Sequence, residues 1–511
     1  MSAIAGVYLL NGDSVDEKDL KRMNDSMPHR GPDGSGLWHD GSVGLAHQML
    51  WTTPESLHEK LPFEADGLVI TSDSRIDNRE ELLPELGLSE VVSDSEVILK
   101  AYGRWGKSCV DRLLGDFAFV IWDKAKEEMF CARDHMGVRP FYYYYMPGEI
   151  FAFATEIKAL FAWGVPRQIN EVRIGDYLLD IEEDKGITFY KDIIRLKPAN
   201  FIAIKNDDFE ELQYWALDPK CEIKLGSDEE YEKAFRDIFK EAVRCRLRSA
   251  FPIGFMLSGG LDSSSIVCMA RKLKPKSNNL DTFSIIFDTL HDCDERSYLE
   301  KVINDGNLST HLILGDKAGP LENMEKMLWH LDQPSFGGNL YLYWPLAMEV
   351  HAQNVRVLLD GVGGDSTVSH GWTYITELAG KWQFISLIKE IRIMSRNFAK
   401  SPSKILFRFA LYPFIPDSLS HYWKMLHSPK DSSQVYTGFL NLDFIKKIAI
   451  EERIIRLQRI RSKPSRTVRE YHWRDLSSGI HPLMNEEVSN ISGAFSFERR
   501  SPFYDKRVVN L

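Results

Sequence analysis

A short glycine- and serine-rich segment, SGGLDSSS at residues 258–265, constrains the fold of this chain more than any other feature. It directly follows the apolar run FPIGFML at 251–257, which is typical of a buried β-strand. Glycines let a backbone approach an anion closely, and serine hydroxyls, backbone amides and the start of a helix near Asp262 favour negative charge. The residues predicted to form a phosphate site are Leu257, Ser258, Gly259, Gly260, Leu261, Asp262, Ser263 and Ser264. The alternative is a plain Gly-Ser turn between a strand and a helix.

A second transition from strand to loop, VRVLLDGVGGD at residues 355–365, repeats this design. Open parallel sheets bind ligands in a crevice at the carboxyl ends of their strands, so we expect the two loops to converge. Because Mg²⁺ prefers oxygen ligands, Asp262 and Asp365 are predicted to hold this ion on a triphosphate. The glycines predicted to bind the same ligand are Gly361, Gly363 and Gly364. Neither loop has the Gly-Lys-Ser/Thr ending of a Walker A loop.

The periodicity of apolar residues changes between residues 215 and 228. Before this point, short apolar runs such as 68–72 and 117–122 are separated by Gly, Pro, Asp and Asn turns, which predicts an α+β half. After it, strand-like segments at 282–287, 310–314 and 355–360 alternate with helical patterns, which predicts a parallel α/β sheet. A chain of 511 residues fits two to four domains, and we place two, at 1–215 and 216–511.

The bulk composition argues against several classes of protein. A formal net charge of -11 disfavours a nucleic-acid-binding protein, which is normally basic. Six scattered cysteines, without a C-x-x-C pair, fit reduced thiols better than a disulfide framework or a zinc site. The start of the chain lacks the pattern of a signal peptide, and the apolar stretch 405–415 is too short to span a bilayer. We therefore expect a cytoplasmic protein that binds neither nucleic acid nor membranes.

Four further motifs in the first half connect these predictions to a known family. They are HRGPDGSG (29–36), GDFAFVIWD (115–123), ARDHMGVRPFYYY (132–144) and FATEIKALF (153–161). These motifs resemble the glutaminase domain of class II amidotransferases, and SGGLDSSS resembles the pyrophosphate-binding loop of ATP pyrophosphatases. In this order, the motifs are similar to the asparagine synthetase family over nearly the whole chain.

The resemblance implies a fold and a reaction. The first half would be an α+β sandwich of the N-terminal-nucleophile-hydrolase kind. The second half would be an α/β parallel-sheet domain of the ATP-pyrophosphatase (adenine nucleotide α-hydrolase-like) kind. That domain would bind ATP and Mg²⁺, adenylate a carboxylate and let an amine attack the acyl-adenylate. The adenine would lie beside the strand at 283–287, which contains Ile285 and Phe287.

The glutaminase-like half departs from the family pattern at three places. A working member begins Met-Cys-Gly, whereas this chain has Ser2, whose hydroxyl is a weaker nucleophile than a thiol. Met49 replaces the arginine that holds the carboxylate of glutamine. Asp73, Ser74 and Arg75 replace the Asn-Gly-Glu of the oxyanion hole, and an aspartate repels the negative charge that develops there. We therefore expect domain 1–215 to be inactive as a glutaminase.

Without ammonia from glutamine, another amine has to be the nucleophile. Three segments, REYHWRDLSSG (469–479), SNISGAFSFERRSPFYDKRVV (489–509) and DGVGGDSTVSHG (360–371), look most like the macrolactam synthetases (cyclases) of lasso peptide biosynthesis. Val362 also stands where asparagine synthetases typically have a glutamate. The resemblance implies a precursor peptide as substrate, with an Asp or Glu side chain joined to its N-terminal amine, and a leader-peptide protease as a second partner.

Family analogy suggests two catalytic residues. Asp332 would help shape the acyl site, and His370 is a candidate proton acceptor for the attacking amine, although a lone loop histidine is more often structural. Two other functions stay open. One is asparagine synthesis from aspartate with ammonia or glutamine, and the other is a non-catalytic scaffold.

Residues 381–430 form a locally basic segment, with nine Lys or Arg against two acids. One interpretation is a docking surface for a peptide or partner protein, with arginines and aromatic residues as anchors. The other is a set of helices that pack aromatic residues inward and expose a solvated basic face. The resemblance also implies a lysine beyond Leu511, so the second domain is expected to be truncated at its C-terminus.

Overall fold

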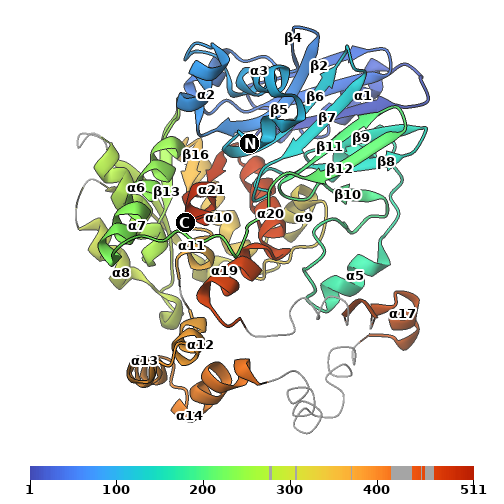
Figure 1. Ribbon diagram of the computed structural model, residues 1–511. Coiled ribbons are helices and arrows are strands. Elements are labelled where there is room, and N and C mark those ends of the chain that lie inside the picture. Colours follow the sequence, from blue (N-terminus) through green and yellow to red (C-terminus); the bar gives the residue numbers. More distant parts are fainter. Residues whose placement is uncertain are drawn as a thin grey trace.

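The computed structural model describes residues 1–274, 279–304, 306, 308–369, 371–415, 440–450, 452–454 and 465–511. Figure 1 shows a β-rich N-terminal half packed against a C-terminal half in which helices surround a second kind of sheet. Within the described ranges, no helix combines the length and the hydrophobicity needed to cross a membrane.

The N-terminal half is a sandwich of two antiparallel sheets. The first sheet has the order β10-β8-β9-β1-β3-β2, and the second has the order β12-β11-β7-β6-β5-β4. Their bounds are β1 Ala3–Leu9, β2 Gly34–Asp40, β3 Val43–Met49, β4 Phe63–Ala65, β5 Leu68–Ile76, β6 Gly115–Asp123, β7 Glu128–Arg133, β8 Tyr142–Met146, β9 Ile150–Ala154, β10 Ile193–Arg195, β11 Asn200–Lys205 and β12 Asp208–Gln213. Side chains such as Ile4, Val120 and Ile202 fill the space between the sheets.

Helices cover both outer faces of the sandwich. The first sheet packs against α1 and α4, and the second against α2 and α3, so the half has four layers. Their bounds are α1 Glu17–Asn24, α2 Arg79–Leu86, α3 Asp94–Trp105 and α4 Ile157–Trp163. The layering places apolar side chains on both faces of each sheet, which is why strands such as β6 read as continuous apolar runs.

The C-terminal half is built on a parallel sheet with the order β15-β14-β13-β16-β17. Its strands are β13 Ile253–Met256, β14 Leu280–Ile286, β15 Leu308–Leu314, β16 Val357–Leu359 and β17 Glu498–Arg500. The strand order reverses around the central strand β13, and such a switch point is where open α/β sheets bind ligands. The predicted α+β and α/β fold classes are confirmed. The edge strand β17 was not predicted.

Helices lie on both faces of the parallel sheet. One apolar core joins α6, α7 and α8 to the sheet, and a second joins α9, α10 and α20 to the opposite face. Their bounds are α6 Asp228–Arg246, α7 Leu261–Leu273, α8 Arg296–Ile303, α9 Met324–Leu331, α10 Leu340–Ala352 and α20 Ile480–Ala494. The remaining helices are α5 Glu171–Leu178, α11 Gly364–Thr367, α12 Thr373–Gly380, α13 Phe384–Asn397, α14 Pro402–Ile405, α17 Leu442–Lys447, α19 Val468–Leu476 and α21 Lys506–Val509.

Helix α20 lies between the two halves and binds both (Figure 1). Its Glu486 accepts hydrogen bonds from Arg133 (3.0 Å), Arg195 (2.7 Å) and the hydroxyl of Tyr142 (2.8 Å), all from the sandwich. All four side chains are buried. Because removing one partner of a buried ion pair costs about 3–5 kcal/mol, this helix fixes the halves in one arrangement.

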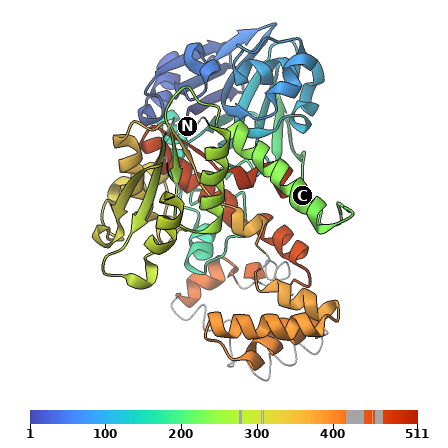
Figure 2. The same cartoon turned by 90° about the vertical axis from the view of Figure 1, so that its left-hand side faces the viewer.

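The described part of the basic segment, 381–415, lies at one end of the molecule, on the orange helices in Figure 2. Leu387, Ile391 and Ile405 are buried in a small core of their own. Trp382 and Ile385, by contrast, are 77% and 89% exposed. The expectation that the aromatic side chains pack inward is therefore wrong for Trp382. Docking on this surface stays a prediction, and residues 416–430 lie outside the described ranges.

Candidate active site

The predicted phosphate loop lies at the carboxyl end of β13 and runs directly into α7. The backbone N–H of Ser258 donates to Oγ of Ser263 (3.1 Å), and that of Gly260 donates to Oγ of Ser258 (3.3 Å). Gly259 has a φ of +82°, a conformation that favours glycine. The loop therefore curls tightly around the first turn of α7, whose amino end carries a partial positive charge.

The second loop follows β16 and packs directly on the first. A Cβ atom on Gly361 would lie 2.8 Å from the backbone nitrogen of Ser263, and one on Gly364 would overlap the carboxylate of Asp262. The backbone contact requires glycine at position 361, whereas an alanine at position 364 would force the carboxylate of Asp262 to rotate away. Gly363 has a φ of +91°, so glycine is favoured there for a conformational reason instead. The two loops thus interlock, as the parallel-strand argument predicts.

A cavity of about 800 Å³ opens between these loops, a volume within the usual range for ligand pockets. The predicted residues that line it are Leu257, Ser258, Gly260, Leu261, Asp262, Ser263, Ile285, Phe287, Gly361 and Asp365. Gly259, Ser264, Gly363 and Gly364 belong to the same loops, but they are not among its lining residues. Leu342 and Leu346, from α10, extend its apolar side opposite the loops and were not predicted.

The carboxylates of Asp262 and Asp365 are electrostatically coupled. Burial, and then the charge of Asp365, raise the pKa of Asp262 above its ordinary value. No described lysine or arginine forms an ion pair with either carboxylate. The negative charge of Asp365 that raises the pKa of Asp262 also attracts a cation, so this donor set fits a divalent metal with oxygen ligands.

Asp360 is a site residue that the sequence analysis missed. It lines the cavity, forms an ion pair with Arg499 and accepts a hydrogen bond from the hydroxyl of Ser501 (2.6 Å). Its other carboxylate contact comes from the backbone N–H of Val362 (3.2 Å), inside the second loop. Asp360 therefore ties that loop to the end of β17. The sequence could have indicated this role, because Asp360 directly precedes the glycines of the second loop.

Helix α19 contacts the segment that follows the second loop and α11. His472 donates from Nε2 to the carbonyl oxygen of Ser369 (2.6 Å). Burial, then Asp475 and Asp365, raise the pKa of Tyr471, so this phenol lies near the predicted metal ligand. The segment REYHWRDLSSG, which suggested the lasso cyclases, thus contacts Ser369, a residue that lines the cavity just after the second loop.

Of the two predicted catalytic residues, only Asp332 lies within the described part of the chain. Asp332 accepts a hydrogen bond from the backbone N–H of Lys158 (2.9 Å) and pairs with its ammonium (3.2 Å), so it contacts the start of α4 in the sandwich. It is not among the residues that line the nucleotide cavity. His370 lies outside the described residues.

The residues at the predicted remnant of a glutaminase site are held by contacts within the sandwich. Ser2 accepts a hydrogen bond at Oγ from the backbone N–H of Leu50 (3.0 Å), and Met49 is buried in β3. Asp73 is buried, 3.6 Å from Arg139, with its second carboxylate oxygen lacking a hydrogen bond within the described chain. Ser74 shares a hydrogen bond with Ser72 (3.1 Å).

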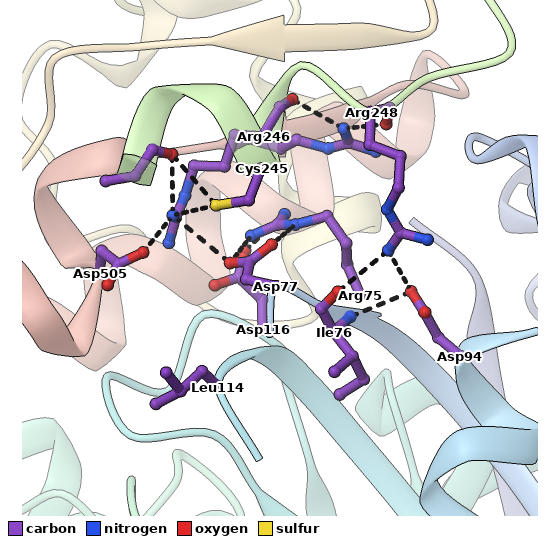
Figure 3. Close-up of polar contacts among 12 residues, drawn as sticks. Arg75, Ile76, Asp77, Asp94, Leu114, Asp116, Cys245, Arg246, Arg248 and Asp505 are labelled. Atoms are coloured by element: carbon purple, nitrogen blue, oxygen red, sulfur yellow. Dashed lines mark hydrogen bonds and ion pairs between the residues drawn. The ribbon is translucent and has the colours of Figure 1, made fainter. Parts of the chain in front are cut away.

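Arg75 points into a buried cluster of carboxylates (Figure 3). It pairs with Asp77 (2.8 Å), Asp116 (2.8 Å) and Glu498 (3.2 Å), the last of which comes from β17 in the other half. Burial opposes ionisation, but Arg500, Arg139 and Arg75 together hold the pKa of Glu498 well below its usual range. At the position where the family resemblance implies a glutamate, this chain therefore has Arg75, a cation that stabilises the structure.

A second group of side chains in Figure 3 is spaced closely enough to bind a metal ion, but an arginine already neutralises its charge. Asp77, Cys245 and Asp505 lie with their ligand atoms within 4.8 Å of one another. Arg246, however, pairs with both Asp505 (2.7 Å) and Asp77 (3.4 Å). The arginine supplies the positive charge, so these acids brace the interface between the halves.

Models of known protein families match two parts of the chain. A model of the glutamine amidotransferase domain matches residues 1–215, and a model of asparagine synthase matches residues 234–511, more than half of the chain. The chain belongs to the asparagine synthase family. The predicted family resemblance is thereby confirmed.

Individual relatives match only part of the chain. Amidase chyE of Penicillium rubens is 31% identical over 69% of this chain, which spans about half (54%) of that protein's length. Asparagine synthetase 3 (glutamine-hydrolyzing) of Bacillus subtilis is 28% identical over 78% of this chain and 68% of its own length. The structure of B. subtilis glutamine phosphoribosylpyrophosphate amidotransferase aligns at 13% identity over 61% of this chain and 81% of that chain, with a TM-score of 0.33. This structural likeness is too low to bear on function.

Proposed function

We propose that the chain is an asparagine synthetase-like, ATP-dependent ligase that activates a carboxylate and joins it to an amine. The observation that carries this proposal is the interlocked pair of loops around a cavity of about 800 Å³. The coupled carboxylates of Asp262 and Asp365 support it, because an ATP site of this kind needs ligands for Mg²⁺.

In this proposal, the loops hold the triphosphate of ATP. Backbone N–H groups and the hydroxyls of Ser258 and Ser263 bind phosphate oxygens, while Ile285 and Phe287 cover the adenine. Mg²⁺, when bound by Asp262 and Asp365, would neutralise charge on the triphosphate.

The reaction then needs two displacements. A carboxylate oxygen of the substrate attacks the α-phosphorus of ATP, the bond to the β-phosphate oxygen breaks, and pyrophosphate leaves. An amine nitrogen next attacks the carbonyl carbon of the acyl-adenylate. The carbon–oxygen bond to AMP breaks, AMP leaves with its electron pair, and the nitrogen releases a proton.

We further propose that the sandwich does not hydrolyse glutamine. Ser2 replaces the thiol nucleophile, and its hydroxyl is held against the backbone of Leu50. Arg75 places a paired cation where the family has a glutamate, and Met49 provides no charge for the carboxylate of glutamine. Each change alone impairs the reaction, and all three occur in one pocket.

The amine of a precursor peptide is then the proposed nucleophile, as in lasso macrolactam synthetases, with a leader-peptide protease as the proposed second partner. Val362 lines the cavity where asparagine synthetases typically have a glutamate, which supports a nucleophile other than ammonia. The contact between α19 and Ser369 at the edge of the cavity supports it too, since α19 carries the cyclase-like segment. The roles of Asp332 at the acyl site and of His370 as proton acceptor stay predictions.

A second candidate is asparagine synthesis from free aspartate and ammonia. The name of the Bacillus subtilis relative favours it, as that protein is an asparagine synthetase. The two functions differ in the carboxylate that is adenylated, so an assay of adenylation separates them.

ATP–pyrophosphate exchange with the purified chain tests the proposal. Exchange that requires a precursor peptide, and that disappears in Asp365→Asn, would support macrolactam formation. Exchange with aspartate alone would replace it by asparagine synthesis. No exchange with either substrate, together with no binding of ATP in calorimetry, would refute the ligase proposal and favour a scaffold.

A further inference from the structure

A buried histidine, His481, lies at the start of α20 and is only 8% exposed. Its Nδ1 lies 2.8 Å from the hydroxyl of Tyr504, and its Nε2 lies 3.3 Å from a carboxylate oxygen of Asp475. The three residues come from separate elements, namely α20, the helical turn Pro502–Tyr504 and α19. None of them lines the nucleotide cavity, so the histidine joins parts of the chain that surround the site without entering it.

The two partners fix the tautomer of the neutral imidazole ring. A carboxylate can only accept hydrogen bonds, so Nε2 of His481 carries the proton and donates to Asp475. Nδ1 is then an acceptor, and the hydroxyl of Tyr504 donates to it. The hydrogen bonds therefore run in one direction, from Tyr504 through His481 to Asp475. Because both ring nitrogens are engaged, the histidine holds its two partners at a fixed separation.

The Tyr504 end of this chain of hydrogen bonds contacts the second loop directly. A Cβ atom on Gly363 would lie 2.8 Å from Cε1 of Tyr504, so the phenol ring packs against the backbone of that glycine. Tyr504 is buried and also belongs to an apolar cluster with Met136 and Leu476. The cluster holds the body of the ring, and the hydrogen bond to His481 holds its hydroxyl end.

The Asp475 end lies against the chain just after Asp365. Helix α19, which carries Asp475, packs against α11, which carries Ser366. The hydrogen bond from His481 lowers the pKa of Asp475, burial opposes this, and hydrogen bonding with the hydroxyl of Ser366 lowers it further. Gly363 and Ser366 stand two residues before and one residue after Asp365. The partners of His481 therefore hold the turn on both sides of the predicted metal ligand.

We propose that His481 is a positioning residue of the ATP site, which keeps Asp365 in place through Tyr504 and Asp475. Within the described part of the chain, no lysine or arginine pairs with Asp365, so the place of its carboxylate depends on the turn that carries it. His481 lies outside the nucleotide cavity and acts only through its two partners. The inference rests on the proposed binding of ATP and Mg²⁺ at Asp365. Residues that act through a metal ligand change metal affinity or activity by about 10- to 100-fold when they are replaced.

Two substitutions of His481 separate its two hydrogen bonds. His481→Gln places an amide N–H near the position of Nε2 and keeps the bond to Asp475, whereas His481→Asn is too short to reach that carboxylate. Calorimetric titration of ATP at a series of Mg²⁺ concentrations gives the Mg²⁺ concentration for half-maximal binding. We expect this concentration to rise by about tenfold in His481→Asn and to stay within about threefold of the wild type in His481→Gln. Excess Mg²⁺ should restore the ATP affinity of His481→Asn, because the phosphate-binding loop itself is unchanged.

His58→Asn is the matched control, since His58 is exposed on the sandwich and lies outside the nucleotide cavity, and it should need no more Mg²⁺ than the wild type. Circular dichroism checks that each variant is folded. If His481→Asn is not, Tyr504→Phe decides the matter, because it keeps the ring on Gly363, removes only the hydroxyl and should raise the Mg²⁺ requirement by about threefold. A wild-type Mg²⁺ requirement in the folded variant, an equal rise in His481→Gln, or a loss of ATP affinity that excess Mg²⁺ does not restore would overturn the inference. If the wild type itself does not bind ATP with Mg²⁺, the ligase proposal fails, and this inference fails with it.

Discussion

The contact between Gly364 and Asp262 makes a sharp prediction about the ATP site. The backbone of Gly364 is not in the left-handed region, so an alanine there causes no conformational strain. Its methyl group would nevertheless overlap the carboxylate of Asp262, which would have to rotate away from its place in the proposed metal site. Overpacking of this kind costs about 1–3 kcal/mol. In Gly364→Ala, we expect this cost to appear as a loss of ATP affinity of about 5- to 150-fold.

Calorimetric titration of ATP in the presence of Mg²⁺ measures this effect, and urea unfolding checks that the variant is folded. Gly319→Ala is the matched control. A Cβ atom on Gly319 meets nothing within 4 Å, and its backbone is also outside the left-handed region, so ATP affinity should stay at the wild-type value. A folded Gly364→Ala that binds ATP within twofold of the wild type would refute the interlocked-loop argument.

Three further predictions concern charged groups. Arg75→Met should lower the free energy of unfolding by about 3–5 kcal/mol, because three buried carboxylates lose their shared cation. Arg112→Met is the control and should lower it by less than about 1 kcal/mol, because the ion pair of Arg112 is half-exposed. Equal losses of the two variants in urea unfolding would contradict this reasoning. Asp365→Asn should lower the pKa of Asp262 and weaken the dependence of ATP binding on Mg²⁺, and an unchanged dependence in calorimetry would argue against the metal site. Burial raises the pKa of Glu59 from 4.5 to about 7, so the folded state holds this proton more tightly, and stability should fall as pH rises through that interval. Glu59→Gln should remove this fall, and parallel thermal-unfolding profiles of variant and wild type between pH 4.5 and 7 would count against it.

The sequence predicts best what is encoded locally. One continuous segment around SGGLDSSS contains the strand, the glycine turn and the helix, so both the geometry and the chemistry of this loop can be predicted from it. The same holds for Gly361 and Gly364, whose small size permits the close approach of the loops. Because both loops follow parallel strands, a general rule about such sheets was enough to bring them together.

Residues whose partners lie far away in the sequence were harder to interpret. β17 consists of Glu498, Arg499 and Arg500, and three charged residues in a row read as an exposed turn. All three are buried, because each finds an opposite charge more than a hundred residues away or on its own strand. Asp332 was placed at the acyl site by analogy, and the contact with Lys158 that fixes its side chain spans 174 positions.

β17 also suggests why the sandwich has been kept. Alternate side chains of a strand face opposite ways, so Glu498 contacts Arg75 in the sandwich while Arg499 contacts Asp360 at the ATP site. A protein that lacked the N-terminal half would leave the buried carboxylate of Glu498 without two of its partners, Arg75 and Arg139. Glu498 is adjacent in sequence to Arg499, which contacts Asp360 in the second loop. On the proposal that the sandwich does not hydrolyse glutamine, Arg75 and Arg139 would still be needed to pair with Glu498 of the other half. We therefore expect these arginines to vary as little as core residues do.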